Sequence, residues 1–517
     1  MVNSNVNALG VIFANTYDNL VPELVAERSM ASIPFGGRYR LIDFTLSSMA
    51  NAGIDNVSVI VRKNYHSLMD HLGAGREWDL TRKRGGLNIV PPFAERSVKL
   101  YSGRVDALDS ILNWLEAQKE RYVILSDSYI AMNFDFNKLI DAHVKSGADV
   151  TMVYNRAAIP EGARSDNYTI RLDDNDRVVE ILSNDYRIGE QNLAMNIYVI
   201  ERESLIHLIH DASVRGLVYF ERDILARNLK LLNVHAYQFD GYVARVSDMK
   251  SYFDENMRLL QDGSMDALFG PAPIYTKIRD DNPTRYLEGS SVKNSLLADG
   301  CVIEGSVENS VLFRGCKIKK GAVVKNCVLM QDTVVEPNCN VEYVVTDKNV
   351  HITEDKKLTG TDTFKIYLPG TPVSDLSAEV YSWVSMANDN DTELTIPIIV
   401  NEAEGFGIYS YDRGTPAEEA EALYNTCKTA YDNFDLQLKA ASTQQKMNEF
   451  ADEMYTTADT CLNQLWKLLK NNVPEDKYQE ILKEQLQWID DKEAAAAKIL
   501  EENDGTSAQL NASLDLA

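Results

Sequence analysis

Three polar residues, Asn15, Asp127 and Asn196, follow runs of apolar residues that have the composition of buried strands. If these runs pair as a mostly parallel sheet, their carboxyl ends meet at one edge, where open α/β sheets bind their ligands. A carboxylate such as Asp127 is the kind of group that holds Mg²⁺ beside a phosphate. The sequence therefore predicts one ligand pocket that contains all three residues.

Four arginines lie in two short motifs and are candidate contacts for an anionic effector. Arg38 and Arg40 belong to Ile33-Pro-Phe-Gly-Gly-Arg-Tyr-Arg-Leu-Ile-Asp-Phe-Thr-Leu46, and Arg76 and Arg82 to Gly75-Arg-Glu-Trp-Asp-Leu-Thr-Arg82. A guanidinium group binds phosphate or carboxylate through charge-assisted hydrogen bonds. The alternative for each arginine is an ordinary surface position with water or a salt-bridge partner.

The first motif resembles the PFGGKYRIIDF signature of the ADP-glucose pyrophosphorylase (glucose-1-phosphate adenylyltransferase) family, and the second is similar to its GxPWDLxR stretch. In that family a glycine-rich loop, roughly AGGxGTRLxPLT…KPA, precedes the signature and holds the nucleotide triphosphate. Here the same interval of 20 residues, from Ala14 to Ile33, has lost these groups. Asn15, Thr16 and Asp18 stand where the family has glycine. Leu20 replaces the arginine of the loop, and Met30 replaces its lysine.

A phosphate-binding loop needs glycines so that backbone N–H groups can approach the phosphates, and cations that offset the charge of the transferring group. An acidic residue such as Asp18 is unfavourable in such a loop. We therefore interpret the loop as a degenerate site, and its alternative is an ordinary strand-to-helix turn.

The later motifs of the family are eroded in the same direction. The motif that carries the first magnesium-binding Asp reads Leu125-Ser-Asp-Ser-Tyr-Ile-Ala-Met-Asn-Phe-Asp135, and the second metal motif reads Gly241-Tyr-Val-Ala-Arg-Val-Ser-Asp248. Arg245 stands where the second carboxylate belongs, which leaves Asp127 and Asp248 as weak candidates for metal ligands. A guanidinium group repels Mg²⁺, which requires oxygen ligands. We expect no metal and no tightly bound cofactor in this chain.

The motifs for the sugar phosphate and the adenine have changed as well. The EKP motif reads Glu180-Ile-Leu182, so that Ile181 replaces the lysine that contacts the glucose phosphate. The SMGIY motif reads Ala194-Met-Asn-Ile-Tyr198, and the adenine-facing GTADA motif reads Gly103-Arg-Val-Asp-Ala107. We expect no catalytic residues at these positions.

A retained scaffold with a lost site resembles the GlgD-type subunit of bacterial ADP-glucose pyrophosphorylase over residues 1–370. The resemblance implies a regulatory, largely non-catalytic subunit in glycogen biosynthesis that forms a hetero-oligomer with a GlgC-type catalytic subunit, responds to a small-molecule effector and leaves Mg²⁺ to that partner. Two alternatives stay open. One is an active nucleotidyltransferase with a metal site rebuilt from Asp127 and Asp248. The other is a binding module that senses a sugar phosphate or nucleotide and recruits a partner through its tail.

Composition restricts the class of protein. The net charge of −25 argues against nonspecific nucleic-acid binding, which depends on Lys and Arg contacts to phosphate. The sequence contains no run of 18 apolar residues, so we expect no membrane span. The N-terminus lacks the basic start and apolar core of a signal peptide, and we therefore expect a cytoplasmic protein. Residues 371–517 hold 28 acidic and 10 basic residues, which indicates a separate module at this end.

The predicted fold class is α/β. Apolar runs at 9–14, 57–61, 122–125, 150–154 and 193–200 alternate with amphipathic stretches, which predicts βαβ units and a mostly parallel sheet. The resemblance implies that residues 1–255 are a Rossmann-like nucleotidyltransferase domain, followed by a linker over 256–287. Residues 288–370 repeat apolar residues every five to six positions, which predicts a left-handed parallel β-helix rather than the edge of an irregular β-sandwich. The expected inward row is Val292, Leu297, Val302, Val307, Leu312, Ile318, Val323, Val328 and Val334, with Cys301, Cys316, Cys327 and Cys339 in small core positions.

The remaining residues do not resemble the pyrophosphorylase family. Residues 371–414 form a mixed segment with a strand-like run at 394–400. Residues 415–503 predict an antiparallel helical bundle that begins at an N-cap Thr415 followed by Pro416. Part of this bundle is similar to the LprI-like module, and its alternative is a plain amphipathic helical hairpin. We expect residues 504–517 to be a disordered tail.

Overall fold

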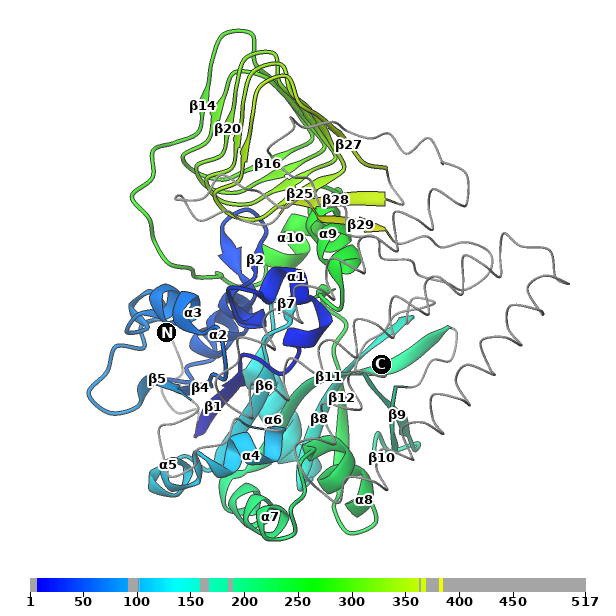
Figure 1. Cartoon of the computed structure of the whole chain (residues 1–517). Coiled ribbons are helices and arrows are strands. Elements are labelled where there is room, and N and C mark those ends of the chain that lie inside the picture. The colour runs from blue at the N-terminus through cyan, green and yellow to red at the C-terminus, as the bar shows by residue number, and fades with distance from the viewer. Residues whose placement is uncertain are drawn as a thin grey trace, which may run out of the picture. The chain divides into compact units, whose positions relative to one another are not determined.

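The computed structural model describes residues 7–91, 101, 103–158, 167–184, 189–361, 364–368 and 381–384. The chain divides into two compact units, residues 1–406 and 407–517, and all described residues belong to the first unit. The predicted run at 394–400, the helical bundle at 415–503 and the tail at 504–517 lie outside the described residues. Figure 1 shows the described elements in colour.

Among the described residues, nine strands form the main sheet of the nucleotidyltransferase region. The strands are β1 (Ala8–Phe13), β4 (Asn56–Ile60), β5 (Gly86–Val90), β6 (Tyr122–Asp127), β8 (Val150–Ala158), β9 (Tyr168–Leu172), β10 (Val178–Ser183), β11 (Glu190–Glu201) and β12 (Val234–Gln238). Strands β5, β4, β1 and β6 are parallel neighbours, as predicted. β11 runs antiparallel to both β6 and β8, so the complete sheet is mixed.

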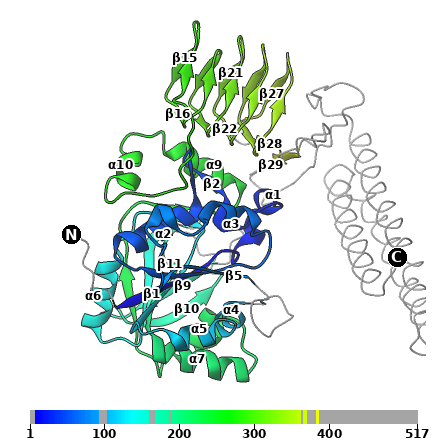
Figure 2. The ribbon, with the colours of Figure 1, turned by 90° about the vertical axis from the view of Figure 1, so that its left-hand side faces the viewer.

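Helices cover both faces of this sheet. They are α2 (Leu41–Asn51), α3 (His66–Leu72), α4 (Arg104–Asp109), α5 (Leu112–Ala117), α6 (Phe136–Ser146) and α7 (Arg202–Val214). Figure 2 shows α2 and α3 on one side of the sheet and α4, α5 and α7 on the other. Successive residues of β1 therefore enter different cores: Ile12 packs with the α2 side, and Val11 with the α7 side. Burial on both faces explains why the strands are near-continuous apolar runs.

One residue of the predicted strand-end set lies inside a strand. Asn196 belongs to β11, where the pairing register with β8 shifts between Ala194 and Tyr198. The φ angle of Asn196 is 54°, and asparagine adopts this left-handed region more readily than most residues. The irregularity directs the Asn196 side chain toward Tyr17 and Tyr129, whose hydroxyl groups it contacts.

Three stacked parallel sheets form the predicted left-handed β-helix. Their strands are β14 (Arg285–Tyr286), β17 (Val302–Ile303), β20 (Lys317–Ile318), β23 (Val334–Val335) and β26 (His351–Ile352); β15 (Ser291–Lys293), β18 (Ser306–Glu308), β21 (Val323–Lys325), β24 (Asn340–Glu342) and β27 (Lys357–Thr359); and β16 (Leu296–Leu297), β19 (Val311–Leu312), β22 (Val328–Leu329), β25 (Val344–Thr346) and β28 (Phe364–Leu368), to which β29 (Tyr381–Val384) is added antiparallel. The four cysteines of this region are free and buried, as expected.

The predicted inward row of the β-helix is wrong at several positions. Val323 is 41% exposed, and its neighbour Val324 is fully buried. Ile303 and Val335 are likewise the inward residues of their strands, while Val302 and Val334 are only half-buried. The coils are unequal in length: pairing partners are 15 residues apart between Val302 and Lys317 but 17 apart between Lys317 and Val334. A fixed repeat of five to six residues therefore drifts off the inward face.

The β-helix and the nucleotidyltransferase region share one hydrophobic core. Phe313 and Met330 of the β-helix pack in the same cluster as Phe44 of α2. Helix α9 (Met249–Arg258) runs through the predicted boundary at residue 255, and α10 (Ser264–Phe269) lies within the predicted linker. The two regions therefore form a continuous packed body. Among the residues that the structure describes, none of the helices has the length and apolar content that crossing a bilayer requires.

Candidate functional site

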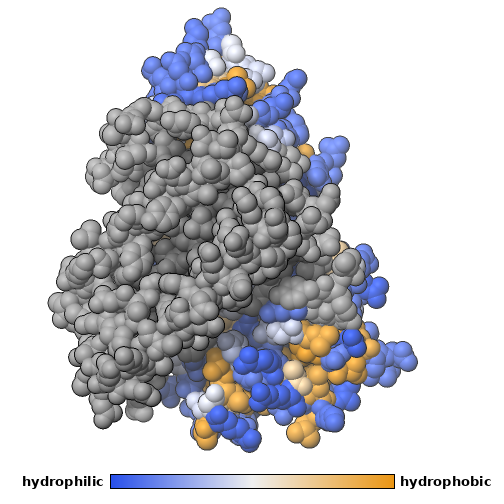
Figure 3. Space-filling model, turned by 45° about the vertical axis from the view of Figure 1, so that its right-hand side comes forward, coloured by the Kyte–Doolittle hydropathy of each residue, from blue (hydrophilic) through white to orange (hydrophobic). Residues whose placement is uncertain are grey.

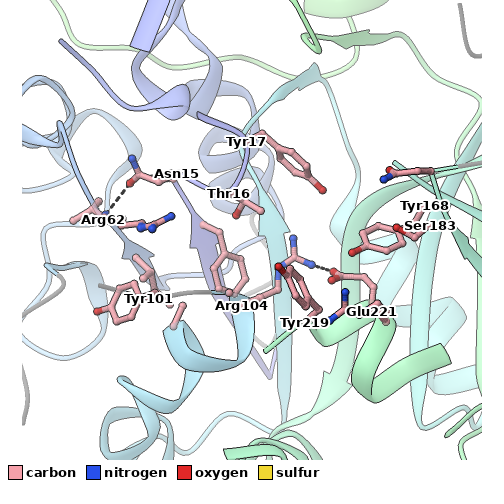
Figure 4. A pocket seen from close by; sticks show the side chains of 18 residues that line it. Asn15, Thr16, Tyr17, Arg62, Tyr101, Arg104, Tyr168, Ser183, Tyr219 and Glu221 are labelled. Atoms are coloured by element: carbon pink, nitrogen blue, oxygen red, sulfur yellow. Dashed lines mark hydrogen bonds and ion pairs between the residues drawn. The ribbon is translucent and has the colours of Figure 1, made fainter. Parts of the chain in front are cut away.

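A cavity of about 300 Å³ lies at the carboxyl ends of β1 and β4, where the sequence predicts a ligand pocket. Its lining residues come from the loops after both strands, from α4 and from the segment before α8 (Ala226–Asn228). They include Asn15, Thr16, Tyr17, Arg62, Tyr101, Arg104, Tyr168, Ser183, Asn184, Tyr219, Glu221 and Arg222, most of which are labelled in Figure 4. Asn15 lines this cavity, whereas Asp127 and Asn196 are buried behind it.

Side chains bond to one another within the loop that follows β1. The Asn15 amide donates to Asp18 Oδ2 at 2.7 Å and to the Lys63 carbonyl at 3.0 Å, while its oxygen accepts the Arg62 N–H at 2.8 Å. Asp18 Oδ1 accepts the Met30 N–H at 2.8 Å. Burial raises the pKa of Asp18, and the hydrogen bonds from Asn15 and Met30 oppose that shift. The loop is therefore held by its own side chains, and the Asp18 carboxylate serves this loop.

Asp127, a weak candidate for a metal ligand, is paired with an arginine. Arg104 at the start of α4 donates to Asp127 Oδ2 at 2.6 Å, and its other terminal nitrogen contacts Glu221 Oε1. Thr16 donates to Asp127 Oδ1 at 3.0 Å. The side chains of Arg104, Asp127 and Glu221 are at most 5% exposed. Burial raises the pKa of Asp127, and the Arg104 guanidinium opposes this shift.

A second polar cluster lies beside this pair and contains Arg245, which stands where the family has its second metal carboxylate. Arg245 of β13 (Val243–Arg245) donates to the Tyr129 hydroxyl at 2.5 Å and to Asn155 Oδ1 at 3.0 Å. Its guanidinium also lies 5.4 Å from the Tyr129 ring centre, and Tyr17 packs on that ring at 4.3 Å. Asn196 donates to both tyrosine hydroxyl groups. Arg245 therefore makes structural contacts with Tyr129 and Asn155 that a carboxylate at this position could not make.

The described residues do not fit a magnesium ion. Both oxygens of Asp127 already accept hydrogen bonds, and the nearest cation is a guanidinium that repels a metal. Asp248 is the N-cap of α9, where its Oδ1 accepts the Ser251 N–H at 2.6 Å. Asp127 and Asp248 thus have different neighbours and separate structural uses.

Ile181, at the position where the family's EKP motif has a lysine, brings no cation to the site. Ile181 lies on β10, paired with Ile170 of β9, and packs partly buried against the core on the α7 side. Glu180 next to it forms an ion pair with Arg171 at 3.0 Å. Ser183 and Asn184 at the end of β10 reach the cavity. This wall therefore offers neutral polar groups to a ligand.

The retained motifs have structural contacts that explain their survival. Asp43 of α2 accepts the Arg40 N–H at 2.9 Å and lies 2.6 Å from His71 Nε2. Trp78, from the second motif, donates to Ser47 Oγ at 3.1 Å and packs on the His71 ring. These residues join α2, α3 and the loop after α3 into one buried cluster. The frame of the family signature is therefore maintained by contacts that do not require catalysis.

The four candidate effector arginines lie in different surroundings. Arg38 pairs with Asp299 of the β-helix at 3.5 Å, with both side chains over 40% exposed. Arg82 pairs with Asp79 at 3.0 Å and is also exposed. Arg76 is exposed as well. Surface ion pairs of this kind contribute little to stability. The structure does not bring these three arginines together with Arg40.

Arg40 belongs to a group of cations between the nucleotidyltransferase region and the β-helix. It donates to the Ser67 carbonyl at 2.6 Å, and burial lowers its pKa to about 10. Burial lowers the pKa of Lys348 to about 7, and the nearby Arg40 and Arg28 guanidinium groups add to the shift. Arg28 itself pairs with the buried Asp347 at 2.6 Å. A lysine held beside two arginines is a favourable place for an anion.

Sequence reasoning identified Asn15 and Thr16 as loop residues at this site but missed most of the other residues that line the cavity. Arg104 was contained in the altered adenine-facing motif, where a cation in place of a neutral residue implies an acidic partner. That partner, Glu221, lies in a distant part of the chain and has no local signal. Tyr168, Tyr219 and Arg62 likewise reach the cavity from separate strands and loops. The fold was needed to bring them together.

Known families match three parts of the chain. The Nucleotidyl transferase family matches residues 20–261, the family described as GlmU-like, C-terminal hexapeptide, matches residues 278–364, and Lysozyme inhibitor LprI matches residues 437–516. The last match confirms the predicted similarity to the LprI-like module and lies outside the described residues.

Curated relatives cover the first two regions. Glycogen biosynthesis protein GlgD of Bacillus subtilis (strain 168) is 34% identical over 359 residues, which is 69% of this chain and 94% of the relative. GlgD of Geobacillus stearothermophilus is 36% identical over 326 residues, 62% of this chain and 83% of the relative. Glucose-1-phosphate adenylyltransferase of Thermotoga sp. (strain RQ2) is 34% identical over 328 residues, 62% of this chain and 76% of the relative. The chain therefore belongs to the glucose-1-phosphate adenylyltransferase family and is similar to its GlgD members.

Proposed function

We propose that this protein acts in glycogen biosynthesis as a regulatory, largely non-catalytic subunit of glucose-1-phosphate adenylyltransferase. Its partner would be a GlgC-type catalytic subunit in the cytoplasm, which makes ADP-glucose and pyrophosphate from ATP and glucose 1-phosphate with Mg²⁺. The observation that carries this proposal is the bond between Arg104 and Asp127, which occupies the metal carboxylate while the frame of the fold is kept. The two named GlgD relatives support the assignment to glycogen biosynthesis.

The structure offers apolar surface for contacts with such a partner. Ile278 in the segment before the β-helix and Tyr286 on its first coil are 68% and 58% exposed. Leu231 and Val214 of the nucleotidyltransferase region are also exposed, at 83% and 77%. Figure 3 shows hydrophobic residues interleaved with hydrophilic ones on the lower part of the molecule. A non-obligate interface needs this mixture of apolar and polar surface.

The decisive experiment measures ADP-glucose formation by the purified chain alone and after titration into a GlgC-type subunit from the same organism. We expect no turnover alone, because the Arg104 guanidinium pairs with Asp127 and would repel Mg²⁺ from this carboxylate. In the titration we expect a saturable change in kcat or in the effector response of the partner. Turnover by the chain alone that EDTA abolishes would contradict the proposal and support the alternative of a rebuilt metal site.

The effector in this proposal is an anion that binds beside Arg40 and Lys348. Arg40 donates to Ser67 and has no carboxylate within ion-pair distance of its guanidinium among the described residues. The charged form of Lys348 is disfavoured by burial and by the two neighbouring arginines, and an anion would relieve this repulsion. Arg38, Arg76 and Arg82 stay predicted effector contacts, but we place the anion at Arg40 and Lys348. Arg38 already pairs with Asp299, and Arg82 with Asp79.

We expect sulfate binding at this cluster to weaken as the pH rises through about 7. Lys348 is charged below that value and neutral above it, so its contribution to anion binding is present at lower pH and lost at higher pH. Asp347 and Asp70 also face the lysine, but the repulsion from Arg40 and Arg28 exceeds their attraction. Calorimetric titration with sulfate, whose own charge is constant in this range, measures the effect. Lys348→Met should remove the pH dependence. The control Arg171→Ala, which breaks an exposed ion pair elsewhere, should leave the pH dependence unchanged. If the affinity of the unmodified chain for sulfate does not change with pH, the prediction is wrong.

A further inference from the structure

We infer that Arg104 takes the place of the metal ion in this site, so that the cavity binds a nucleotide without Mg²⁺. The inference begins from the disagreement between the family's metal chemistry and the residues present. In a metal-dependent site the cation between the carboxylate and the phosphates is an ion that arrives with the nucleotide. Here the cation beside Asp127 is covalently part of the chain, and it contacts Glu221 as well.

The Arg104 guanidinium is well held in this position. It stacks over the rings of Phe13 and Tyr198, at 5.0 and 5.8 Å from their centres. Its side chain is 4% exposed, and its Nε has no hydrogen-bond acceptor among the described residues. A buried guanidinium that lines a cavity attracts an anionic ligand strongly, because its charge is little screened by water there. Arg104 therefore provides a fixed positive charge at the wall of the cavity.

The walls of the cavity fit the two parts of a nucleotide. Tyr168 and Tyr219 form one side. Tyr219 is 42% exposed, and the Arg222 guanidinium lies 4.1 Å from the centre of its ring. A nucleotide base can stack on such rings whatever its identity, because every base has a π-face. On the opposite side Arg62 extends toward Thr16, as Figure 4 shows, and its guanidinium has no ion-pair partner in the described parts of the chain. An arginine in this position suits a phosphate group.

The volume and the charges decide how large the ligand is and whether a metal comes with it. A cavity of about 300 Å³ is at the lower limit for small-molecule sites, which favours a single nucleotide. Mg²⁺ bound to the phosphates would be repelled by the Arg104 guanidinium, which already pairs with Asp127. The free nucleotide also keeps its full negative charge for Arg62. The metal-free nucleotide is therefore the better ligand.

Calorimetric titration of the full chain with ATP tests this inference, once in EDTA and once with excess Mg²⁺. We expect saturable binding in EDTA that Mg²⁺ weakens or leaves unchanged, which is the reverse of a metal-dependent nucleotide site. Adenosine should bind more weakly than ATP because it lacks the group that contacts Arg62. Binding that requires Mg²⁺, or no measurable binding of ATP at millimolar concentration, would overturn the inference.

Arg62→Ala localises the ligand, because this exposed side chain can be removed without disturbing the core. We expect it to weaken ATP about 10- to 100-fold, the effect of losing a charge-assisted hydrogen bond, and to leave adenosine unchanged. The matched control is Arg121→Ala, an exposed arginine paired with Glu201 at the amino end of β6. Equal affinity of ATP for the Arg62→Ala variant and the unmodified chain would place the nucleotide elsewhere and contradict the inference.

This inference rests on the proposed absence of catalysis at the same site, and the two fail differently. The binding titration contains no catalytic subunit, so a missing effect on that subunit leaves the titration result intact. Conversely, a chain that regulates its partner but binds no ATP would overturn the inference and not the proposed function. Metal-dependent turnover by the isolated chain would contradict both.

Discussion

Replacing Arg104 by methionine is expected to lower the free energy of unfolding by about 3–5 kcal/mol, the usual result of removing one partner from a buried ion pair. The variant leaves Asp127 and Glu221 without the guanidinium that now contacts both. Methionine fills a similar volume between Phe13 and Tyr198, so the loss reflects the charges rather than a cavity. Urea unfolding of the full chain, with midpoint and slope compared between variants, measures the difference.

The pH dependence of this variant separates charge from packing. Burial already raises the pKa of Asp127, and removing Arg104 removes the main interaction that opposes the shift. The folded variant should therefore take up a proton at Asp127 at a pH where the unfolded chain has lost it, so that its deficit shrinks as the pH falls toward 5. A deficit that is independent of pH would indicate a packing defect instead.

Removing all three charges gives the control for Arg104→Met. Arg104→Met combined with Asp127→Asn and Glu221→Gln leaves no unpaired buried charge, and replacing a complete buried ion set by neutral groups is often close to neutral in stability. We expect this triple variant to recover most of the lost stability. If it is as unstable as the single variant, or if the single variant loses less than about 1 kcal/mol, the ion set does not hold the site together.

The outcome at the cavity shows which features of a degenerate site a sequence can predict. The loss of glycine at Asn15, Thr16 and Asp18 was evident from residue types, because a phosphate loop needs backbone freedom. That Asn15 and Asp18 bond to each other was not evident, since the spacing only places them near one another. The sequence thus predicted what the loop cannot do, and the structure was needed to show how it is held.

Contacts between distant segments were the least predictable feature. Arg104 finds its two carboxylates on β6 and on the segment before α8, and pattern reasoning has no means of pairing residues so far apart. The same holds for strand β11. Its apolar run at 193–200 was predicted, but its antiparallel direction depends on the path of the chain between β10 and β11, which the run itself does not determine. In the β-helix, unequal coils moved Val323 outward, which a fixed repeat could not anticipate. Local patterns specify elements, and tertiary pairing specifies faces and partners.

Replacing Arg28 by methionine is expected to cost about 3–5 kcal/mol, comparable to Arg104→Met, because it breaks a buried ion pair between the loop after β1 and the β-helix. Arg28 and Asp347 are 2.6 Å apart, and their side chains are 7% and 9% exposed. Without Arg28 the Asp347 carboxylate would keep the Tyr367 hydroxyl at 3.2 Å and the Lys348 N–H at 2.7 Å, neither of which carries a compensating charge.

Two further variants make this result interpretable. Arg171→Ala breaks the pair with Glu180, whose side chains are 55% and 42% exposed, and should change the free energy of unfolding by less than about 1 kcal/mol. Arg28→Met combined with Asp347→Asn removes both charges and should recover much of the loss. A single variant as mild as Arg171→Ala would show that the shared hydrophobic core alone joins the two regions.

The Arg28 variant also connects stability with the proposed regulation. Arg28 is one of the two arginines that lower the pKa of Lys348, so its removal should raise that pKa from about 7 toward the usual lysine value. Sulfate binding by the Arg28→Met variant should then persist to higher pH, even though the variant is less stable. A loss of stability by itself would not shift the midpoint of this pH dependence. If the midpoint stays near 7, Arg28 does not lower the pKa of Lys348, and the pH dependence of sulfate binding does not arise from this pair of cations. The anion would then be bound mainly by Arg40.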